Sequence, residues 1–204
     1  MTTFLLIRHG ETDYLGERLA GRLPGIHLNA AGRAKAEAVA AMLKPLSLDA
    51  VYSSPLERAM ETAEPTARAA GKEIRADDRL QEVDFGGLAG KPFSELRDLP
   101  IWKDVHLRPA EIRYPGGESL QDVQDRAVRM IRETAAGRES GIVAVFTHAD
   151  TIRLALACFL SMPLAAYHAL VVSPASVSVL SLKGAAVRVS GVNLPAGSPL
   201  HGIM

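Results

Sequence analysis

Cysteine is almost absent from this sequence, which contains only one, Cys158, among its 204 residues. A single cysteine cannot form a disulfide bond within the chain, so nothing indicates that the protein works in an oxidising compartment. Cys158 stands in the apolar stretch LALACFLSM, where we expect it to be a small residue of the hydrophobic core.

An excess of charge of either sign is also missing, because 23 Lys and Arg residues balance 23 Asp and Glu residues. This balance gives no indication of a basic arm for nucleic acids or of a polybasic patch for membranes. No apolar run is long enough to span a bilayer, and the first residues, MTTFLLIRHG, lack the features of a signal peptide. We therefore expect a cytoplasmic protein whose partners are neither nucleic acids nor membranes.

Short apolar runs alternate along the chain with longer segments that have helical spacing. Strands are predicted at 3–7, 48–54, 72–76 and 141–148, helices at 29–46, 55–70, 118–137 and 151–160, and a hairpin at 175–194 that turns at Lys183-Gly184. Strands that alternate with helices predict an α/β fold with a mainly parallel sheet. The length and the 48% hydrophobic content fit one domain, 1–204, with a sizeable core.

One long segment, at about 77–117, breaks this alternation. It is rich in Gly and Pro and too polar for a continuous core element, so we expect an irregular insert or lid. Long loops of this kind often carry binding residues, and substrate specificity would reside there.

Residues that can carry chemistry follow three of the predicted strands. RHG, with His9, and FTHAD, with His148, directly follow apolar strands, and Arg58 lies in the first turn of the helix after VYSSP. Ligands of parallel sheets bind at the carboxyl ends of the strands, so we expect these three ends to converge.

The side chains at these ends, together with Glu82 in the insert, are of the types that phosphoryl transfer needs. Arginines such as Arg8 and Arg58 bind phosphate through forked hydrogen bonds, and an imidazole can attack phosphorus. A carboxylic acid can protonate the leaving oxygen, and a second imidazole can stabilise the charge on the transferred group. Arginines and histidines can supply all the positive charge, so we expect neither a metal nor another cofactor.

Five motifs occur in a fixed order over most of the chain: RHGET, SSPLERAMETA, LQEVDFGGLAG, YPGGES and FTHAD. In this ordered set the sequence resembles the histidine phosphatases, also called the phosphoglycerate mutase-like superfamily. The resemblance implies a three-layer α/β/α sandwich around a mostly parallel sheet. It also implies roles for four residues: His9 as the phosphorylated nucleophile, Arg58 as the phosphate clamp, Glu82 as the proton donor and His148 as the second histidine of the pocket.

The expected site is completed by residues that hold the substrate. Phosphate would dock against Arg8 and Thr12, and we expect Gly21 and Ala149 to contact substrate as well. The ring nitrogen of His9 that does not attack would donate to a backbone carbonyl, which fixes the tautomer.

The sequence departs from the family pattern at three places. Leu15 or Gly16 stands where members often carry an Asn that touches the phosphate. Asp150 follows the second histidine where Gly is common; it either repels a poorly placed phosphate or serves as the first-turn acid of the next helix, and we favour the second interpretation. EVDFGG replaces an Arg-His-Tyr-Gly run of the glycolytic mutases, which favours a phosphatase over a mutase.

Three functions therefore compete: a metal-independent phosphomonoesterase that acts on a small phosphorylated metabolite, a phosphomutase of the same family, and a non-catalytic binder of phosphorylated ligands. Trp102 either lines the pocket or packs within the insert, and Arg108 and Arg113 either bind a second anionic group or are solvated. A zinc site from His9, His148 and Asp150 has little support, because no close-spaced ligand pair is present. The substrate and the oligomeric state stay open, with a homodimer among the alternatives.

Overall fold

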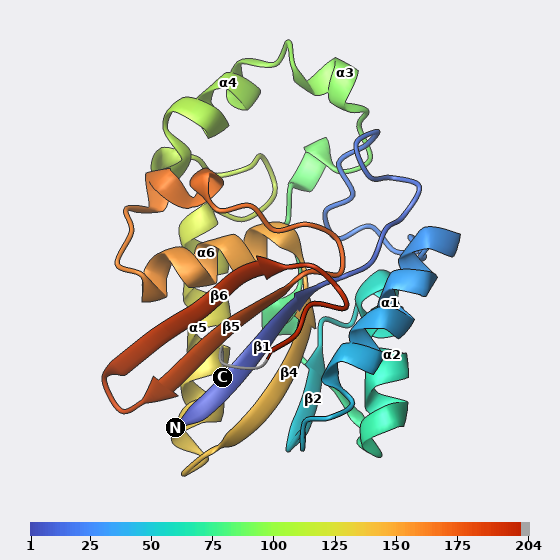
Figure 1. Cartoon of the computed structure of the whole chain (residues 1–204). Coiled ribbons are helices and arrows are strands. Elements are labelled where there is room, and N and C mark those ends of the chain that lie inside the picture. Colours follow the sequence, from blue (N-terminus) through green and yellow to red (C-terminus); the bar gives the residue numbers. More distant parts are fainter. Residues whose placement is uncertain (201–204) are drawn as a thin grey trace.

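The computed structural model describes residues 1–200, apart from the side chain of His106, and is built around one six-stranded sheet (Figure 1). The strands are β1 (Thr2–Arg8), β2 (Ala50–Ser53), β3 (Ile74–Ala76), β4 (Gly141–Thr147), β5 (Val177–Lys183) and β6 (Ala186–Leu194). Their order is β3-β2-β4-β1-β5-β6. Only β5 runs against its neighbours, so the prediction of a mostly parallel sheet is confirmed.

Helices cover both faces of the sheet (Figure 1). Helices α1 (Ala30–Leu43) and α2 (Glu57–Ala70) pack on one face, and α5 (Leu120–Ala136) and α6 (Ala149–Phe159) pack on the other. Successive side chains of a strand point to opposite faces. Accordingly, Leu5 of β1 lies in the core under α1 and α2, whereas Leu6 lies in the core under α5 and α6. The fold is the three-layer α/β/α arrangement that the family resemblance implies.

The predicted element boundaries differ from the observed ones by a few residues. The helix predicted from residue 55 begins at Glu57, because Leu56 still has an extended backbone. The strand predicted at 72–76 is shorter and begins at Ile74, and the hairpin connects β5 and β6 directly after Lys183. Cys158 is partly exposed on α6, so the expectation of a core cysteine was wrong.

The segment 77–117 is more ordered than its composition predicts. It contains two short helices, α3 (Phe93–Leu96) and α4 (Pro100–Leu107), and three single 3-10 turns, η1 (Asp78–Leu80), η2 (Gly86–Leu88) and η3 (Pro109–Glu111). Leu96, Val105 and Tyr114 are buried in a separate apolar cluster. Short helices at this spacing gather scattered apolar residues into a small core, which the overall polarity of the segment hides.

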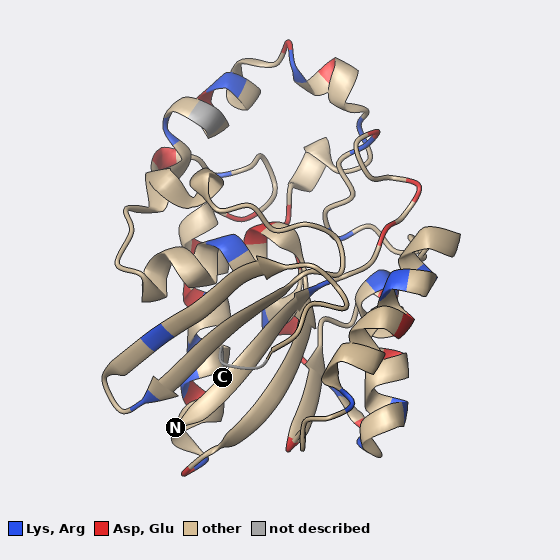
Figure 2. Ribbon diagram, in the orientation of Figure 1, with Lys and Arg blue, Asp and Glu red and all other residues tan. Residues whose placement is uncertain are grey.

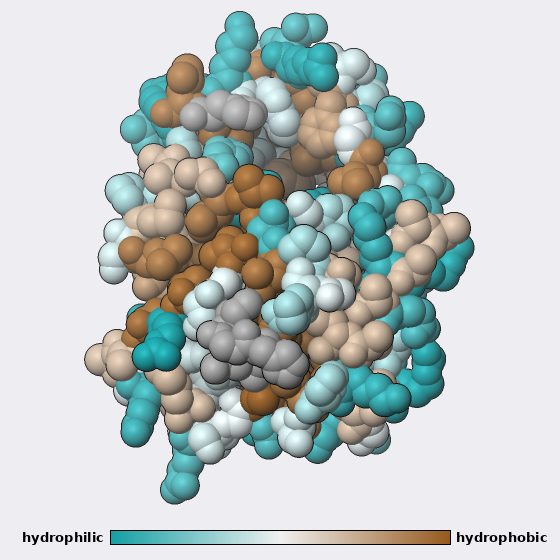
Figure 3. Space-filling view, viewed as in Figure 1, coloured by the Kyte–Doolittle hydropathy of each residue, from teal (hydrophilic) through white to brown (hydrophobic). Residues whose placement is uncertain are grey.

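This insert lies beyond the carboxyl ends of β1 and β4, above the sheet in the view of Figure 1. A space-filling view shows that the surface is hollowed between the insert and the sheet layers (Figure 3). Acidic and basic residues are spread over the helices and the insert, with few on β5 and β6 (Figure 2). No helix within residues 1–200 is both long enough and apolar enough to cross a membrane.

Candidate active site

The ends of β1 and β4 bring the two predicted histidines together. The strands pair in parallel with Arg8 opposite Thr147, and the backbone N–H of His9 donates to the carbonyl of Thr147 at 2.9 Å. His9 and His148 therefore leave the sheet side by side, and their ring centroids are 5.2 Å apart at an interplanar angle of 61°. The convergence of strand ends that the sequence predicts is present for both imidazoles.

The tautomer of His9 follows from its hydrogen bond. Its Nδ1 lies 2.7 Å from the carbonyl oxygen of Gly10, and a carbonyl can only accept, so Nδ1 carries the proton and Nε2 keeps its lone pair. Burial, and then the charges of Arg58 and Arg8, lower the pKa of His9 well below its usual range. The ring is therefore neutral near pH 7, which is the state that can act as a nucleophile.

His148 lies behind His9, with its side chain wholly buried. Its Nε2 is 2.8 Å from the hydroxyl of Ser54. This hydroxyl also accepts from the backbone N–H of Leu56 at 3.4 Å, so its own hydrogen is free to donate to Nε2. When the hydroxyl donates, the proton of a neutral His148 sits on Nδ1, which is buried and has no hydrogen-bond partner among the described residues.

Two arginines beside the imidazoles also hold unpaired N–H groups. Arg58, which is 1% exposed, donates from Nη2 to the carbonyl of Gly21 at 2.6 Å, and Arg8 donates from Nη1 to the carbonyl of Val172 at 2.7 Å. Nε and Nη1 of Arg58 and Nε of Arg8 are buried without a partner in the described part of the chain. Buried unpaired cations are costly, so this group of donors suits an anion.

A cavity of about 210 Å³ opens onto these side chains. Seven of the eight predicted site residues line it: Arg8, His9, Thr12, Gly21, Arg58, Glu82 and Ala149. The remaining one, His148, stands behind His9. The rest of the wall was not predicted as a set, and it consists of Tyr14, Leu15, Gly16, Arg18, Leu19, Ala20, Phe85, Phe93, Asp150 and Arg153.

Glu82 faces this cavity with a carboxyl group suited to hold a proton. Its Oε1 accepts from the backbone N–H of Val83 at 3.0 Å and lies 3.3 Å from the hydroxyl oxygen of Thr151. Burial, and then the negative charge of Asp150, raise the pKa of Glu82 above its usual range. A carboxyl group that stays protonated to a higher pH is a better proton donor near neutrality.

The loop that carries Glu82 is held by an arginine that the sequence analysis missed. Arg126 of α5 donates to the carbonyls of Arg79 and Gln81 at 2.7 Å each and to the carbonyl of Glu82 at 3.0 Å. Both carboxylate oxygens of Glu118 accept from the same guanidinium at 3.0 and 3.1 Å. The only sequence signal was that Glu118 belongs to the YPGGES motif.

Close backbone contacts fix the two loops that carry the site. A Cβ on Gly10 would lie 2.7 Å from the carbonyl oxygen of Gly32 in α1, and the N–H of Gly10 donates to Thr62 at 2.9 Å. Gly86 has a φ of +52°, and a Cβ there would lie 2.1 Å from the carbonyl oxygen of Pro115. Only glycine allows these approaches, so both turns are held in one position.

The loop after His9 and the insert close the mouth of the cavity together. Three backbone hydrogen bonds join them. The N–H of Leu19 donates to the carbonyl of Lys91 at 3.0 Å, and the N–H of Gly90 donates to the carbonyl of Leu19 at 2.7 Å. The N–H of Phe93 donates to the carbonyl of Glu17 at 3.0 Å. We call residues 17–19 and 90–93 the clasp. It joins two segments that lie far apart in the sequence.

The arginines expected as a second anion site do not reach the cavity. Arg108 is exposed and pairs with Asp104 at 2.8 Å and with Glu111 at 3.5 Å. Arg113 is exposed and pairs with Asp122 at 2.7 Å. Of the two interpretations left open, the structure supports solvated surface arginines.

The structure also shows where the other residues with alternative interpretations lie. Trp102 packs in the insert against Phe93, with ring centroids 5.9 Å apart, and it is Phe93 that lines the cavity. Both Leu15 and Gly16 line the cavity at the position where an Asn was expected. Asp150 is the first-turn acid of α6 as favoured, and it also lines the cavity. In the part of the chain that is described, no group of three or more His, Cys, Asp or Glu side chains could hold a metal ion.

A comparison with protein families gives a match to the histidine phosphatase superfamily (branch 1) over residues 4–195. A bifunctional protein of Mycobacterium tuberculosis is 36% identical over 157 residues, and this chain spans only 43% of its length. A 2,3-bisphosphoglycerate-dependent phosphoglycerate mutase of Thermoplasma acidophilum is 31% identical over 90% of this chain and 88% of that protein. The solved structure of a mycobacterial glucosyl-3-phosphoglycerate phosphatase superposes with a TM-score of 0.86 at 28% identity and covers 95% of this chain and 99% of that one.

Proposed function

Because this chain belongs to the histidine phosphatase superfamily, we propose that it hydrolyses a small phosphomonoester through a phosphohistidine at His9. Glu82 is the proton donor of this reaction, and Arg8, Arg58 and His148 bind the phosphoryl group. Some relatives are named as enzymes that act on such molecules, among them a phosphoserine phosphatase of Hydrogenobacter thermophilus. A structure of an Entamoeba histolytica phosphoserine phosphatase contains phosphoserine.

One observation carries the proposal: the hydrogen bond from His9 Nδ1 to the carbonyl of Gly10 leaves Nε2 with its lone pair. His9 lines a cavity together with Arg58 and Arg8, whose guanidinium groups carry buried N–H groups without a partner in the described residues. A non-catalytic phosphate binder would need the arginines, but it would need neither a neutral imidazole nor a carboxyl group with a raised pKa beside them.

The first step transfers the phosphoryl group to the enzyme. Thr12, Arg8 and Arg58 hold the phosphate oxygens. The Nδ1–H of His148, which otherwise has no partner in the described residues, donates to a further phosphate oxygen. The lone pair of His9 Nε2 forms the bond to phosphorus while the bond from phosphorus to the leaving oxygen breaks in line. Glu82 gives its proton to that oxygen, so the product leaves as an alcohol and Glu82 becomes a carboxylate.

The second step returns the enzyme to its starting state. Water enters beside Glu82, and the carboxylate takes one proton from it as its oxygen attacks phosphorus. The bond between His9 and phosphorus breaks, which restores the lone pair on Nε2 and releases inorganic phosphate. All protons are then back where they began, so neither a metal nor a redox partner is needed to balance the cycle.

A phosphomutase would share the first step and differ in the second, because the phosphoryl group would return to another hydroxyl of a retained intermediate. The EVDFGG stretch favours hydrolysis. Phe85 of this stretch lines the cavity and packs edge-on against Tyr114 with ring centroids 4.8 Å apart, so it offers no cation to a substrate carboxylate. The cations of the wall, Arg18 and Arg153 among them, come from other segments.

The direct test is release of phosphate from p-nitrophenyl phosphate in the presence of EDTA. We expect turnover by the wild type and a loss of about a thousandfold or more in His9→Ala, because the covalent route is closed. His27→Ala is the matched control, since His27 is an exposed histidine whose ring contacts Glu61 outside the cavity. Full activity of His9→Ala, at an unchanged melting temperature, would remove His9 from the reaction.

The mutase alternative needs a separate assay. The enzyme is incubated with 3-phosphoglycerate and a catalytic amount of 2,3-bisphosphoglycerate, and both 2-phosphoglycerate and inorganic phosphate are measured. We expect phosphate without accumulation of 2-phosphoglycerate. Rapid formation of 2-phosphoglycerate without phosphate would make the chain a mutase.

A further inference from the structure

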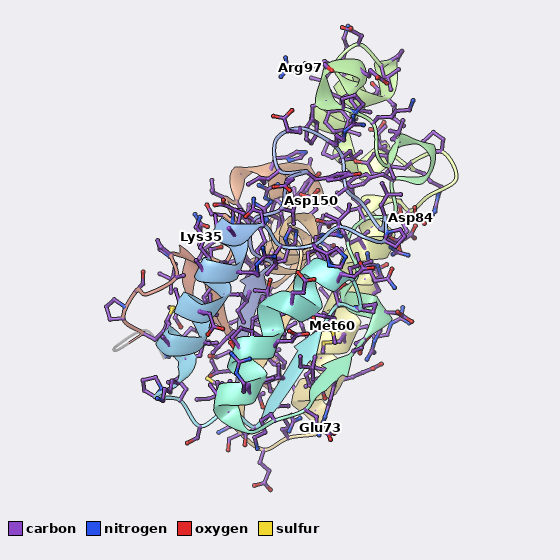
Figure 4. All side chains as sticks on the ribbon, turned by 90° about the vertical axis from the view of Figure 1, so that its right-hand side faces the viewer. Lys35, Met60, Glu73, Asp84, Arg97 and Asp150 are labelled. Carbon is purple, nitrogen blue, oxygen red and sulfur yellow. The ribbon has the colours of Figure 1, made fainter. Side chains whose placement is uncertain are left out.

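Asp150 is an acidic residue in the wall of a cavity that otherwise suits an anion. It lies in the first turn of α6, two residues after His148, and it lines the same cavity as His9 and Glu82. Figure 4 places it between the helices of the main body and the insert. A negative charge near a bound phosphate weakens phosphate binding, so a carboxylate at this position should favour another step of the reaction.

The position of Asp150 is fixed by a partner on its own helix. Nη1 of Arg153 donates to Oδ1 of Asp150 at 2.9 Å, and both side chains are largely shielded from solvent. The next residue, Thr151, donates its hydroxyl to the carbonyl of Gln81 at 2.9 Å and lies 3.3 Å from Oε1 of Glu82. The first turn of α6 therefore fixes the position of Asp150 relative to the loop that carries Glu82.

Glu82 stands between charges of opposite sign. Arg8 from the end of β1 and Arg58 from the start of α2 both lower the pKa of its carboxyl group. Burial and Asp150 from α6 act in the other direction, and together they prevail. Without Asp150 burial alone would oppose the two arginines, so the pKa of Glu82 would fall.

The remaining titratable and charged groups around Glu82 do not replace Asp150. They are His9, Arg22, Tyr114, Glu118, Arg126, Arg153 and Tyr167. His9 is neutral, and burial raises the pKa of both tyrosines, so these three carry no charge near pH 7. Arg22 and Arg126 donate to the backbone carbonyl of Glu82 and share Glu118 as their counter-ion.

We propose that Asp150 is a positioning residue for the acid step, whose negative charge keeps the proton on Glu82 until the leaving oxygen takes it. This inference rests on the proposed function. Asp150 transfers no proton itself, and the proton that leaves Glu82 is the one later recovered from water. Esters of poorly acidic alcohols depend on this step, whereas p-nitrophenolate departs without being protonated.

The test is the pH profile of kcat/KM for Asp150→Asn with two esters, p-nitrophenyl phosphate and 2-phosphoglycerol. For the wild type, the fall at high pH reports loss of the Glu82 proton in the free enzyme. We expect Asp150→Asn to move this fall to lower pH by about one unit with 2-phosphoglycerol. At pH 8 that ester should lose about tenfold in kcat/KM, while p-nitrophenyl phosphate changes by less than about threefold.

Matched variants separate this role from a structural one. Asp150→Glu keeps the charge and should restore most of the profile, and Asp13→Asn, an exposed residue on the loop after His9, should leave it unchanged. Asp150→Ser gives a second neutral variant if the Asn variant folds poorly. Equal losses for both esters, or an unmoved high-pH limb, would overturn the inference alone. A wild type that hydrolyses neither ester would overturn the proposed function and, with it, this inference.

Discussion

His9 and His148 lie edge to face, 5.2 Å between ring centroids, although they are far apart in the sequence. The contact exists because β1 and β4 are parallel neighbours whose last residues, Arg8 and Thr147, pair in register. A third strand end contributes as well, since Ser54 directly follows β2 and its hydroxyl reaches Nε2 of His148. Three adjacent strand ends thus determine how the second imidazole is oriented.

Ser54→Ala should therefore impair the reaction, although the side chain of Ser54 acts through His148 and does not contact the substrate. Loss of the 2.8 Å hydrogen bond leaves Nε2 of His148 unpaired and frees the tautomer, so Nδ1 no longer holds its proton reliably. We expect kcat to fall by roughly tenfold and stability by about 1–2 kcal/mol. Steady-state kinetics and denaturant titration measure the two effects.

Ser53→Ala is the matched control, because Ser53 is equally buried but donates to the carbonyl of Ser54 rather than to His148. It should lose stability without the same loss in kcat. If both variants keep full kcat, the hydroxyl of Ser54 has no part in orienting the ring.

The two buried histidines should also make stability depend on pH. Burial lowers the pKa of His9 and of His148 well below 6.5, so below that pH the unfolded chain binds more protons than the folded one. Their contribution is complete above pH 6.5 and is lost as pH falls toward the folded-state pKa values.

Comparing His148→Asn with the wild type isolates one ring, because the other titrating groups are common to both. Between pH 7 and pH 5 the unfolding free energy of the wild type should fall by up to about 2 kcal/mol more than that of the variant. Chemical denaturation at the two pH values gives the difference. Equal falls would mean that His148 is not held neutral in the folded protein.

Arg126→Ala should affect the acid from a distance. The guanidinium joins the carbonyls of Arg79, Gln81 and Glu82 to the carboxylate of Glu118, so its removal leaves several buried groups unpaired. We expect a loss of about 3–5 kcal/mol in stability and a lower kcat for alkyl phosphates with little change in KM. Arg129→Ala, on the exposed side of the same helix, should change neither quantity.

Gly10→Ala tests the turn that carries His9. The added Cβ would stand 2.7 Å from the carbonyl oxygen of Gly32, so either the turn or the start of α1 must move. We expect a loss of about 1–3 kcal/mol and a larger fall in kcat than in stability-matched variants, because Nε2 shifts relative to the phosphate. Gly87→Ala, whose Cβ meets nothing within 4 Å, is the control and should stay within about 0.5 kcal/mol of the wild type.

The sequence predicted the sheet, its four covering helices and the strand ends of His9 and His148. These features follow from short-range patterns: apolar periodicity, and the rule that parallel strands place their carboxyl ends together. It did not predict that Arg126 holds the Glu82 loop, because a long side chain reaches its partners only after α5 packs on the sheet. The average polarity of the insert concealed Leu96, Val105 and Tyr114, which join an apolar cluster shared with α5 and α6.

The clasp between residues 17–19 and 90–93 is joined by main-chain hydrogen bonds, which do not depend on the side chains of Leu19 and Phe93, whereas the φ of +82° at Gly90 favours glycine. Arg18, Leu19 and Phe93 of the clasp line the same cavity as His9. Their side chains can be exchanged without breaking the main-chain bonds that join the two segments, so the rim of the cavity can be reshaped while the scaffold beneath it persists.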